Sequence, residues 1–314
     1  APHVQGAGGL GAFESGGKGA RRMTLAARSG HLAMLLFSVL VAGSFALGVL
    51  AANDIAPMAL NAARFAIAAA IIGTVIVLRG GFPAGSFAAP WRYLVLAVIF
   101  ATYFVLMFEG LKTAPSVSAA AVFTLTPILS AGFGWLMLRQ RLTGRMGFAL
   151  FIGGLGALWV IFRADVPAIL RFEVGRGEVI YFWGCVSHTA YTPLVRKLNR
   201  GESALVFTFG TLVAGAGVLT VVGWSDIVAT DWGNLPAVVW LTIFYTAVFA
   251  SAATFTLLQF AALRLPSSKV MAYTYLVPAW VIVWDVALGG TAPPVAVVAG
   301  IALTAVALVL LLRD

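Results

Sequence analysis

The stretch that decides the fold occurs twice, as APSVSAAAVFTLTP at residues 114–127 and as LPSSKVMAYTYLVP at residues 265–278. In each stretch a proline stands second and another, Pro127 or Pro278, closes the stretch twelve residues later. Two prolines in register are rare by chance inside apolar helices, where proline is disfavoured. We therefore interpret the two stretches as corresponding parts of a duplicated unit.

The chain around these stretches is strongly apolar. Of its 314 residues, 61% are hydrophobic and only 10% are charged, with a mean hydropathy of +0.99. A soluble domain is about half apolar and a quarter charged, so the composition predicts a membrane protein. Each helical span needs about 20 apolar residues. We expect ten spans, at residues 31–51, 57–78, 92–111, 116–136, 146–162, 179–195, 204–222, 237–260, 267–289 and 294–312.

The duplication sets the expected topology of this all-α membrane protein. Five spans per copy is an odd number, so the second copy enters the bilayer upside down, as in the inverted repeats of secondary transporters. We expect a disordered cytoplasmic segment (1–30), a first five-helix repeat (31–162), an extracytoplasmic connector (163–178) and a second five-helix repeat (179–314). Met23 is interpreted as the natural start, with residues 1–22 as a remnant added ahead of it.

The distribution of charge and the cysteine content indicate the topology and exclude some kinds of binding site. With the N-terminus inside, 15 of the 20 Lys and Arg fall in inward segments, which is the positive-inside pattern and places both termini in the cytoplasm. The net charge of +9 is thus explained by topology rather than by nucleic acid binding. Cys185 is the only cysteine, so neither an intrachain disulfide nor a cysteine metal cluster is expected.

At this point the residues resemble the drug/metabolite transporter superfamily, in its EamA-type ten-helix bacterial branch. The resemblance covers residues 31–312 and rests on diffuse motifs. These are AGS (42–44), NAARFA (61–66), SAAAVFTLTP (118–127), LRQRLTGRMGFALFIGGLGALWV (138–160) and GEVIYFWGCVSHTAYTPLVRK (177–197). The overall look of the chain is similar to exporters of aromatic and other neutral amino acids.

The chain departs from the family pattern at three positions. The family often has Glu in the turns after the fourth and ninth spans, where this chain has Gln140 and Thr291. His188 stands where the sixth span commonly carries Trp. Roles tied to those family residues are not carried over.

The resemblance implies that the first, third, fourth, sixth, eighth and ninth spans line a central cavity. Their middle thirds offer aromatic and hydroxyl side chains without a permanent charge, which suits compact amphipathic solutes better than strongly anionic ones. The candidate substrate-binding residues are Ser44, Thr102, Tyr103, Phe123, Trp183, Ser187, His188, Tyr245, Ser251 and Tyr275. For each aromatic ring, packing in the core or against lipid is the alternative interpretation.

Prolines and ionisable groups within the spans are further candidates. Pro127 and Pro278 each remove one helical hydrogen bond, so we interpret them as hinges, with a static kink as the alternative. Arg64 is expected to pair with Glu109 or Asp54 as a structural clamp. Glu109 and Asp285 lie near outer span ends, where interfacial solvation is the alternative to a role in proton coupling. His188, near mid-span, either contacts substrate, senses protons or packs as a neutral histidine.

The sequence therefore predicts a secondary transporter in the bacterial inner (plasma) membrane. It would move small neutral metabolites outward by alternating access, with neutral and aromatic amino acids as the expected substrates and no cofactor or metal. Two alternatives stay open: a carrier for nucleotide-sugars, polyamines or drugs, and a non-transporting membrane enzyme. No motif of a hydrolase or protease supports the enzyme.

Overall fold

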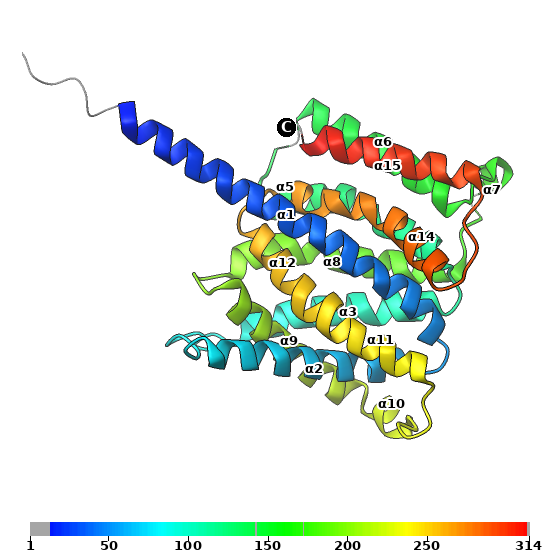
Figure 1. The fold of residues 1–314 in the computed structure, drawn as a ribbon, viewed down its shortest axis with the longest axis horizontal. Coiled ribbons are helices and arrows are strands. Elements are labelled where there is room, and N and C mark those ends of the chain that lie inside the picture. Colours follow the sequence, from blue (N-terminus) through cyan, green and yellow to red (C-terminus); the bar gives the residue numbers. More distant parts are fainter. Residues whose placement is uncertain (1–12, 142, 172, 313–314) are drawn as a thin grey trace, which may run out of the picture.

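A computed structural model describes residues 13–141, 143–171 and 173–312, and over these residues the chain is entirely helical and turn (Figure 1). This confirms the expected all-α class for the described residues. The unbroken long helices are α1 (Phe13–Ala51), α2 (Pro57–Leu78), α3 (Trp91–Leu111), α6 (Gly144–Ile161), α8 (Arg176–Leu198), α9 (Ala204–Val222) and α15 (Val295–Leu312). Short helices α7 (Val166–Arg171) and α10 (Trp224–Ala229) lie in connections.

Three further helical runs change register along their length. The first consists of α4 (Ser116–Phe123) and α5 (Thr126–Leu138). The second consists of α11 (Ala237–Ala247), the π-helix η1 (Val248–Ala253) and α12 (Thr254–Ala262). The third consists of α13 (Ser267–Ala272), the 3-10 helix η2 (Tyr273–Leu276) and α14 (Val277–Ala287).

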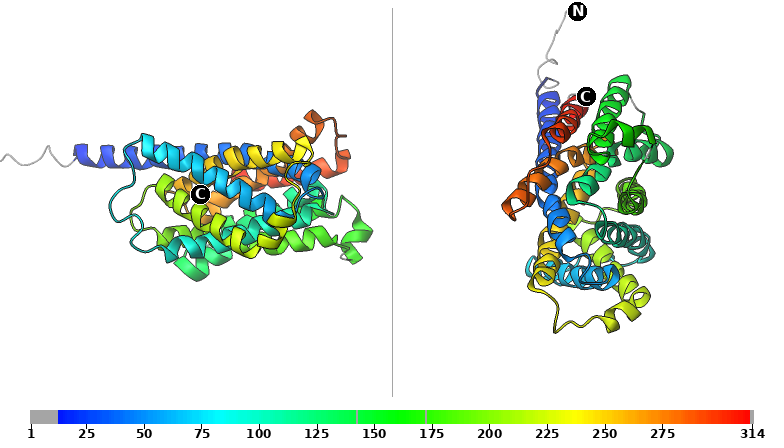
Figure 2. Two further views of the ribbon diagram at one scale, coloured as in Figure 1. Left: turned by 90° about the horizontal axis from the view of Figure 1, so that it is seen from below. Right: turned by 90° about the vertical axis from the view of Figure 1, so that its right-hand side faces the viewer.

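Nine helical runs within the described ranges are long and apolar enough to cross a membrane. The run predicted as the sixth span, α8, is 23 residues long but is not among them, because its middle is too polar. The start of α1 also differs from expectation. Residues 1–12 of the segment expected to be disordered lie outside the described residues, whereas 13–30 are helical and extend α1 beyond the rest of the bundle (Figures 1 and 2).

The helices pack in pairs that join distant parts of the sequence. The pairs α3 with α8, α6 with α15 and α2 with α9 make the most extensive contacts. Glycines let two of these pairs approach closely. Gly110 of α3 faces Gly177 of α8, and Gly156 of α6 faces Gly300 of α15, in each case backbone against backbone. Small residues at such crossings are the usual means by which membrane helices pack tightly.

The Gly156 contact gives a prediction with a matched control on the same helix. A Cβ at Gly156 would lie 2.6 Å from the carbonyl oxygen of Gly300, whereas one at Gly147 would meet nothing within 4 Å. We expect Gly156→Ala to destabilise the protein by about 1–3 kcal/mol through overpacking. Gly147→Ala should instead stabilise it by up to ~1 kcal/mol, because alanine favours the helix. Thermal unfolding in detergent measures both, and shifts of the same sign would contradict the α6–α15 contact.

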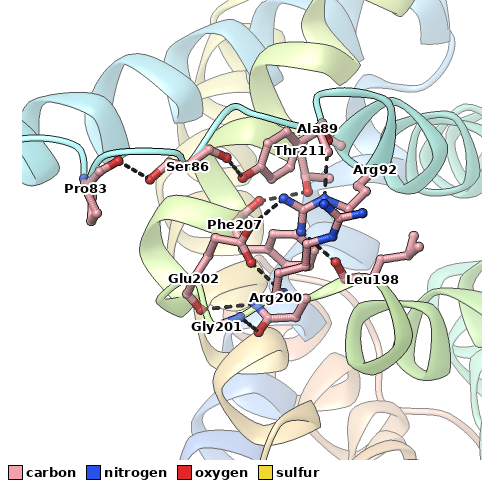
Figure 3. Close-up of polar contacts among 12 residues, drawn as sticks. Pro83, Ser86, Ala89, Arg92, Leu198, Arg200, Gly201, Glu202, Phe207 and Thr211 are labelled. Carbon is pink, nitrogen blue, oxygen red and sulfur yellow. Dashed lines mark hydrogen bonds and ion pairs between the residues drawn. The ribbon is translucent and has the colours of Figure 1, made fainter.

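A buried ion pair fixes the first turn of α3 to the turn between α8 and α9 (Figure 3). Arg92 donates from Nη2 to Glu202 Oε1 at 2.5 Å and from Nη1 to the carbonyl oxygen of Leu198 at 2.7 Å. The Arg92 and Glu202 side chains are 2% and 9% exposed. Glu202 Oε2 also accepts from the backbone N–H of Arg200 at 2.7 Å. The pair therefore joins α3, in the first half of the chain, to the α8–α9 turn in the second half.

The Glu202 carboxylate makes stability depend on pH. Burial alone would raise the pKa of Glu202, but hydrogen bonds from Arg92 and from the Arg200 backbone outweigh it and hold that pKa below its usual value of 4.5. A lowered pKa contributes stability above the unfolded-state value, which is lost as pH falls through the folded-state value. We expect Glu202→Gln to cost about 2 kcal/mol at pH 7. Its thermal unfolding curve should converge with that of the unaltered protein as pH falls below 4.5 and through the lowered pKa of the folded state, and a constant gap would contradict this.

Candidate functional site

An aromatic cluster surrounds His188 at the centre of the bundle. The imidazole centroid lies 4.4 Å from that of Tyr103, 5.2 Å from Phe100 and 5.3 Å from Phe123. Helices α3, α4 and α8 supply these rings, and each of the four residues is at most 1% exposed. Tyr191 extends the stack, with its ring 4.2 Å from Phe100. We define His188, Phe100, Tyr103, Phe123 and Tyr191 as the central cluster.

Several polar atoms in and around the central cluster have no partner. Tyr103 and Tyr181 share a hydrogen bond between their hydroxyls at 3.0 Å. Both ring nitrogens of His188, by contrast, form no hydrogen bond within the described residues, and neither does the hydroxyl of Ser44 or Thr192. Buried polar groups are almost always paired. The unpaired atoms are therefore the positions at which hydrogen bonds to a polar solute would contribute most to its binding.

The structure separates the predicted substrate-binding residues into groups. It brings Tyr103, Phe123 and His188 together in the central cluster, and Ser44 is next to Phe45, whose ring lies 5.8 Å from Phe123. Thr102 and Trp183 lie on the outer surface, where Trp183 is 61% exposed. These last two face away from the cluster, so we leave them out of the candidate site.

The four remaining predicted residues hold helices against one another. The hydroxyl of Ser187 donates to the carbonyl oxygen of Ile99 at 2.7 Å, and that of Tyr245 donates to the carbonyl oxygen of Leu40 at 2.8 Å. The Tyr275 ring packs on Gly153, and its hydroxyl has no partner within the described residues. Ser251 contacts Arg64.

Arg64 is fully buried, but its partners are not those predicted. Its guanidinium donates to Ser251 Oγ at 3.0 Å, to the carbonyl oxygen of Ala250 at 2.9 Å and to Asn61 Oδ1 at 3.2 Å. The guanidinium carbon lies 3.8 Å from the ring centroid of Phe104, a cation–π contact. The expected pairing with Glu109 or Asp54 is therefore wrong.

The π-helix η1 explains these partners. In a π-helix the hydrogen bonds run to the fifth residue rather than the fourth, and the change of register leaves a backbone carbonyl available to a side chain. Ala250 lies within η1 and gives its carbonyl to Arg64. Arg64 thus ties α2 to the middle of the run that contains α11 and α12. Hydropathy carries no signal for such a change in register.

The carboxylates near the span ends each have a hydrogen-bond or ion-pair partner. Glu109 pairs with Lys112 at 2.6 Å on the surface. Asp285 accepts a hydrogen bond of 2.5 Å from Ser116, which connects the end of α14 to the start of α4. Glu178, at the start of α8, accepts one of 2.8 Å from Ser118. The first turn of α4 is thus held by carboxylates from two other helices, α14 and α8.

The two internal prolines lie at matching breaks. Pro127 is in the first turn of α5, after the gap that separates it from α4, and Pro278 is in the first turn of α14, after η2. The carbonyl oxygen of Phe123 accepts the hydroxyl of Thr126 at 2.7 Å, and the hydroxyls of Thr126 and Thr274 lie 3.1 Å apart. The broken spans therefore meet at their breaks.

Sequence reasoning missed three residues of the centre: Phe100, Tyr181 and Gln259. Gln259 donates from Nε2 to the hydroxyl of Tyr191 at 2.7 Å. One signal was present for Tyr181, because it lies seven residues before His188 and so shares a helix face with it. No comparable spacing links Phe100 or Gln259 to α8, because their proximity is tertiary.

Comparison with known proteins fits this architecture. The model of the EamA-like transporter family matches the chain twice, over residues 28–162 and 175–313. The chain belongs to the EamA-like transporter family. A relative of this EamA protein is the "Uncharacterized transporter YyaM" of Bacillus subtilis (strain 168). The two are 26% identical over 261 residues, covering 82% of this chain and 86% of the relative.

A solved structure, titled only "Crystal structure of protein", has the same fold as this EamA transporter. It matches with a TM-score of 0.69 and 21% identity, covering 91% of this chain and 96% of the other. The family and the Bacillus relative identify the chain as a multi-pass membrane transporter of the drug/metabolite superfamily.

Proposed function

We propose that this EamA transporter exports small neutral amphipathic metabolites, with amino acids, including aromatic ones, as the substrates. Transport proceeds by alternating access across the bacterial inner membrane, without a cofactor. The observation that carries the proposal is the central cluster, in which unpaired polar atoms lie among aromatic rings at the centre of the bundle.

The chemistry of the central cluster supports a neutral amphipathic solute. Its rings offer π faces to an ammonium group and flat apolar surface to an aromatic side chain. The buried cation Arg64, which lies over the ring of Phe104 beside Phe100, already donates three hydrogen bonds to protein acceptors. A multiply charged anion would find no set of unpaired cations there, and burying it would be costly.

The pairing of spans supports alternating access by two inverted repeats. Under the proposed symmetry the contact of α3 with α8 corresponds to that of α1 with α11 and α12, and both are present. The contact of α14 with α1 likewise corresponds to that of α5 with α8. We assign Pro127 and Pro278, at the matching breaks, as the hinges.

The same symmetry gives the proposed topology. We count α8 as a span in addition to the nine described apolar runs, which brings the total to ten. Residues 31–162 and 179–314 are assigned to the two repeats, with 163–178 as the extracytoplasmic connector. The double match to the family supports this division. The start of α1 and the end of α15 point to the same end of the bundle (Figure 1), which is consistent with two cytoplasmic termini and an even number of crossings.

Counterflow in proteoliposomes tests the proposal. We expect liposomes preloaded with a neutral amino acid to accumulate the labelled form, and phenylalanine or another aromatic amino acid to compete. Pro127→Ala with Pro278→Ala should slow counterflow by about fivefold per site, because each restores a helix hydrogen bond worth roughly 1 kcal/mol. Absence of counterflow for every amino acid would exclude the substrate class, and unchanged flux in the proline variant would exclude the hinges.

A further inference from the structure

One end of the bundle carries a pocket whose lining includes no residue of the central cluster. Its cavity measures about 490 Å³ and lies where α5, α6, α8 and α13 come together. Ala131, Met146 and Ser268, each at most 8% exposed, form its buried lining. Arg141, Arg196 and Lys269 line its mouth. We call this cavity the basic pocket.

The basic pocket presents cations and hydrogen-bond donors. Arg141 comes from the turn after α5, Arg196 from the last turn of α8 and Lys269 from α13. No acidic residue lines the cavity, and no carboxylate in the described part of the chain forms an ion pair with any of the three. Gln140 accepts at Oε1 from the backbone N–H of Ser267, at 3.4 Å, which fixes its amide beside the pocket. Three unneutralised cations around one cavity favour a bound anion.

The surroundings of the basic pocket favour an amphiphilic anion. Trp135 lies one helical turn beyond Ala131 on α5, on the same face of that helix, and is 63% exposed. Large apolar side chains exposed on a membrane helix face acyl chains, and tryptophan is typical of the headgroup level. An anionic group in the pocket would thus have an apolar surface beside it.

We infer that the basic pocket binds an anionic phosphate group, that of an acidic phospholipid headgroup in the adjacent leaflet. Arginine pairs with phosphate oxygens through two parallel N–H bonds, and lysine contributes a point charge. Basic pockets between membrane helices are suited to such headgroups. The bound phosphate would bridge α8 and α13 to the α5–α6 turn and so stabilise the arrangement of helices seen here. This inference is independent of the substrate proposed above.

Lipid-dependent stability of the purified protein in neutral detergent tests the inference. Added phosphatidylglycerol should raise the thermal unfolding temperature with a saturable dependence, whereas phosphatidylethanolamine should not. The triple variant Arg141→Gln, Arg196→Gln, Lys269→Gln should weaken the apparent affinity for phosphatidylglycerol by at least tenfold. Arg79→Gln removes an exposed cation outside the pocket and should leave the affinity unchanged.

Two outcomes would overturn the inference. If inorganic phosphate alone gives the same shift in the unaltered protein and loses it in the triple variant, the site is for a soluble anion and the lipid assignment is wrong. If the triple variant keeps its response to phosphatidylglycerol, the pocket is not an anion site. The singly substituted Arg141→Gln and Lys269→Gln proteins, each with a weaker response, provide the same comparison should the triple variant fail to fold.

Discussion

Replacing Arg64 by alanine is expected to lower the free energy of unfolding by about 4 kcal/mol, the largest effect of any single substitution proposed here. The change removes three hydrogen bonds from a charged donor, each worth roughly 1.5–3 kcal/mol. It also leaves the carbonyl oxygen of Ala250 without its partner and creates a cavity beside Phe104. The variant no longer buries a charge, and the desolvation cost that is avoided offsets part of the lost stability.

Thermal unfolding followed by a thiol-reactive fluorogenic dye measures this effect, because Cys185 is the only cysteine and is fully buried. Arg64→Lys should give an intermediate loss, since lysine keeps the charge but lacks the planar fork. Arg79→Ala, at an exposed site, should have the same unfolding temperature as the unaltered protein. An Arg64→Ala protein of normal stability and lost transport would contradict the clamp and make Arg64 a substrate contact instead.

Replacing His188 by leucine is expected to reduce amino-acid counterflow at least tenfold while leaving the unfolding temperature unchanged or higher. Neither ring nitrogen has a partner in the described structure. The substitution therefore removes a desolvated polar group and leaves no hydrogen-bond partner unpaired. Leucine keeps most of the apolar contacts with Tyr103 and Phe123. A role in substrate binding therefore predicts reduced counterflow at an unchanged or higher unfolding temperature. A role in packing alone predicts a lower unfolding temperature.

Tyr275→Phe is the matched control for His188. The Tyr275 hydroxyl is likewise buried and without a partner among the described residues, but its ring packs on Gly153 of α6 rather than in the central cluster. We expect Tyr275→Phe to retain counterflow. Equal loss in both variants would show that buried orphan groups in general support transport, and normal flux in His188→Leu would exclude the imidazole from the substrate path.

The spans and their breaks could be predicted from the sequence because both depend on local chemistry. Run lengths of apolar residues gave α2 and α9 with their observed bounds. Proline, which lacks the N–H that a helix needs, marked the interruptions at Pro127 and Pro278. The register change at η1 has no such marker, so the partners of Arg64 could not be foreseen.

The side-chain directions were the least predictable part of the site. In a soluble helix a polar face identifies the exposed side, but a membrane helix is apolar all round. Thr102 and Trp183 were therefore assigned to the centre although they lie on the surface. Phe100 was missed because its place beside His188 follows from the contact of α3 with α8, which no pattern within α3 encodes.

The breaks at Pro127 and Pro278 have a consequence for how the protein responds to membrane thickness. At about 1.5 Å per residue, the 13 residues of α5 extend about 20 Å and the 11 residues of α14 about 17 Å. Neither piece alone crosses a hydrocarbon layer of about 30 Å. The projected length of each broken span therefore depends on the angle at its break. Lipids with longer or shorter acyl chains match different angles, so the thickness of the bilayer itself becomes an effector of the conformational equilibrium.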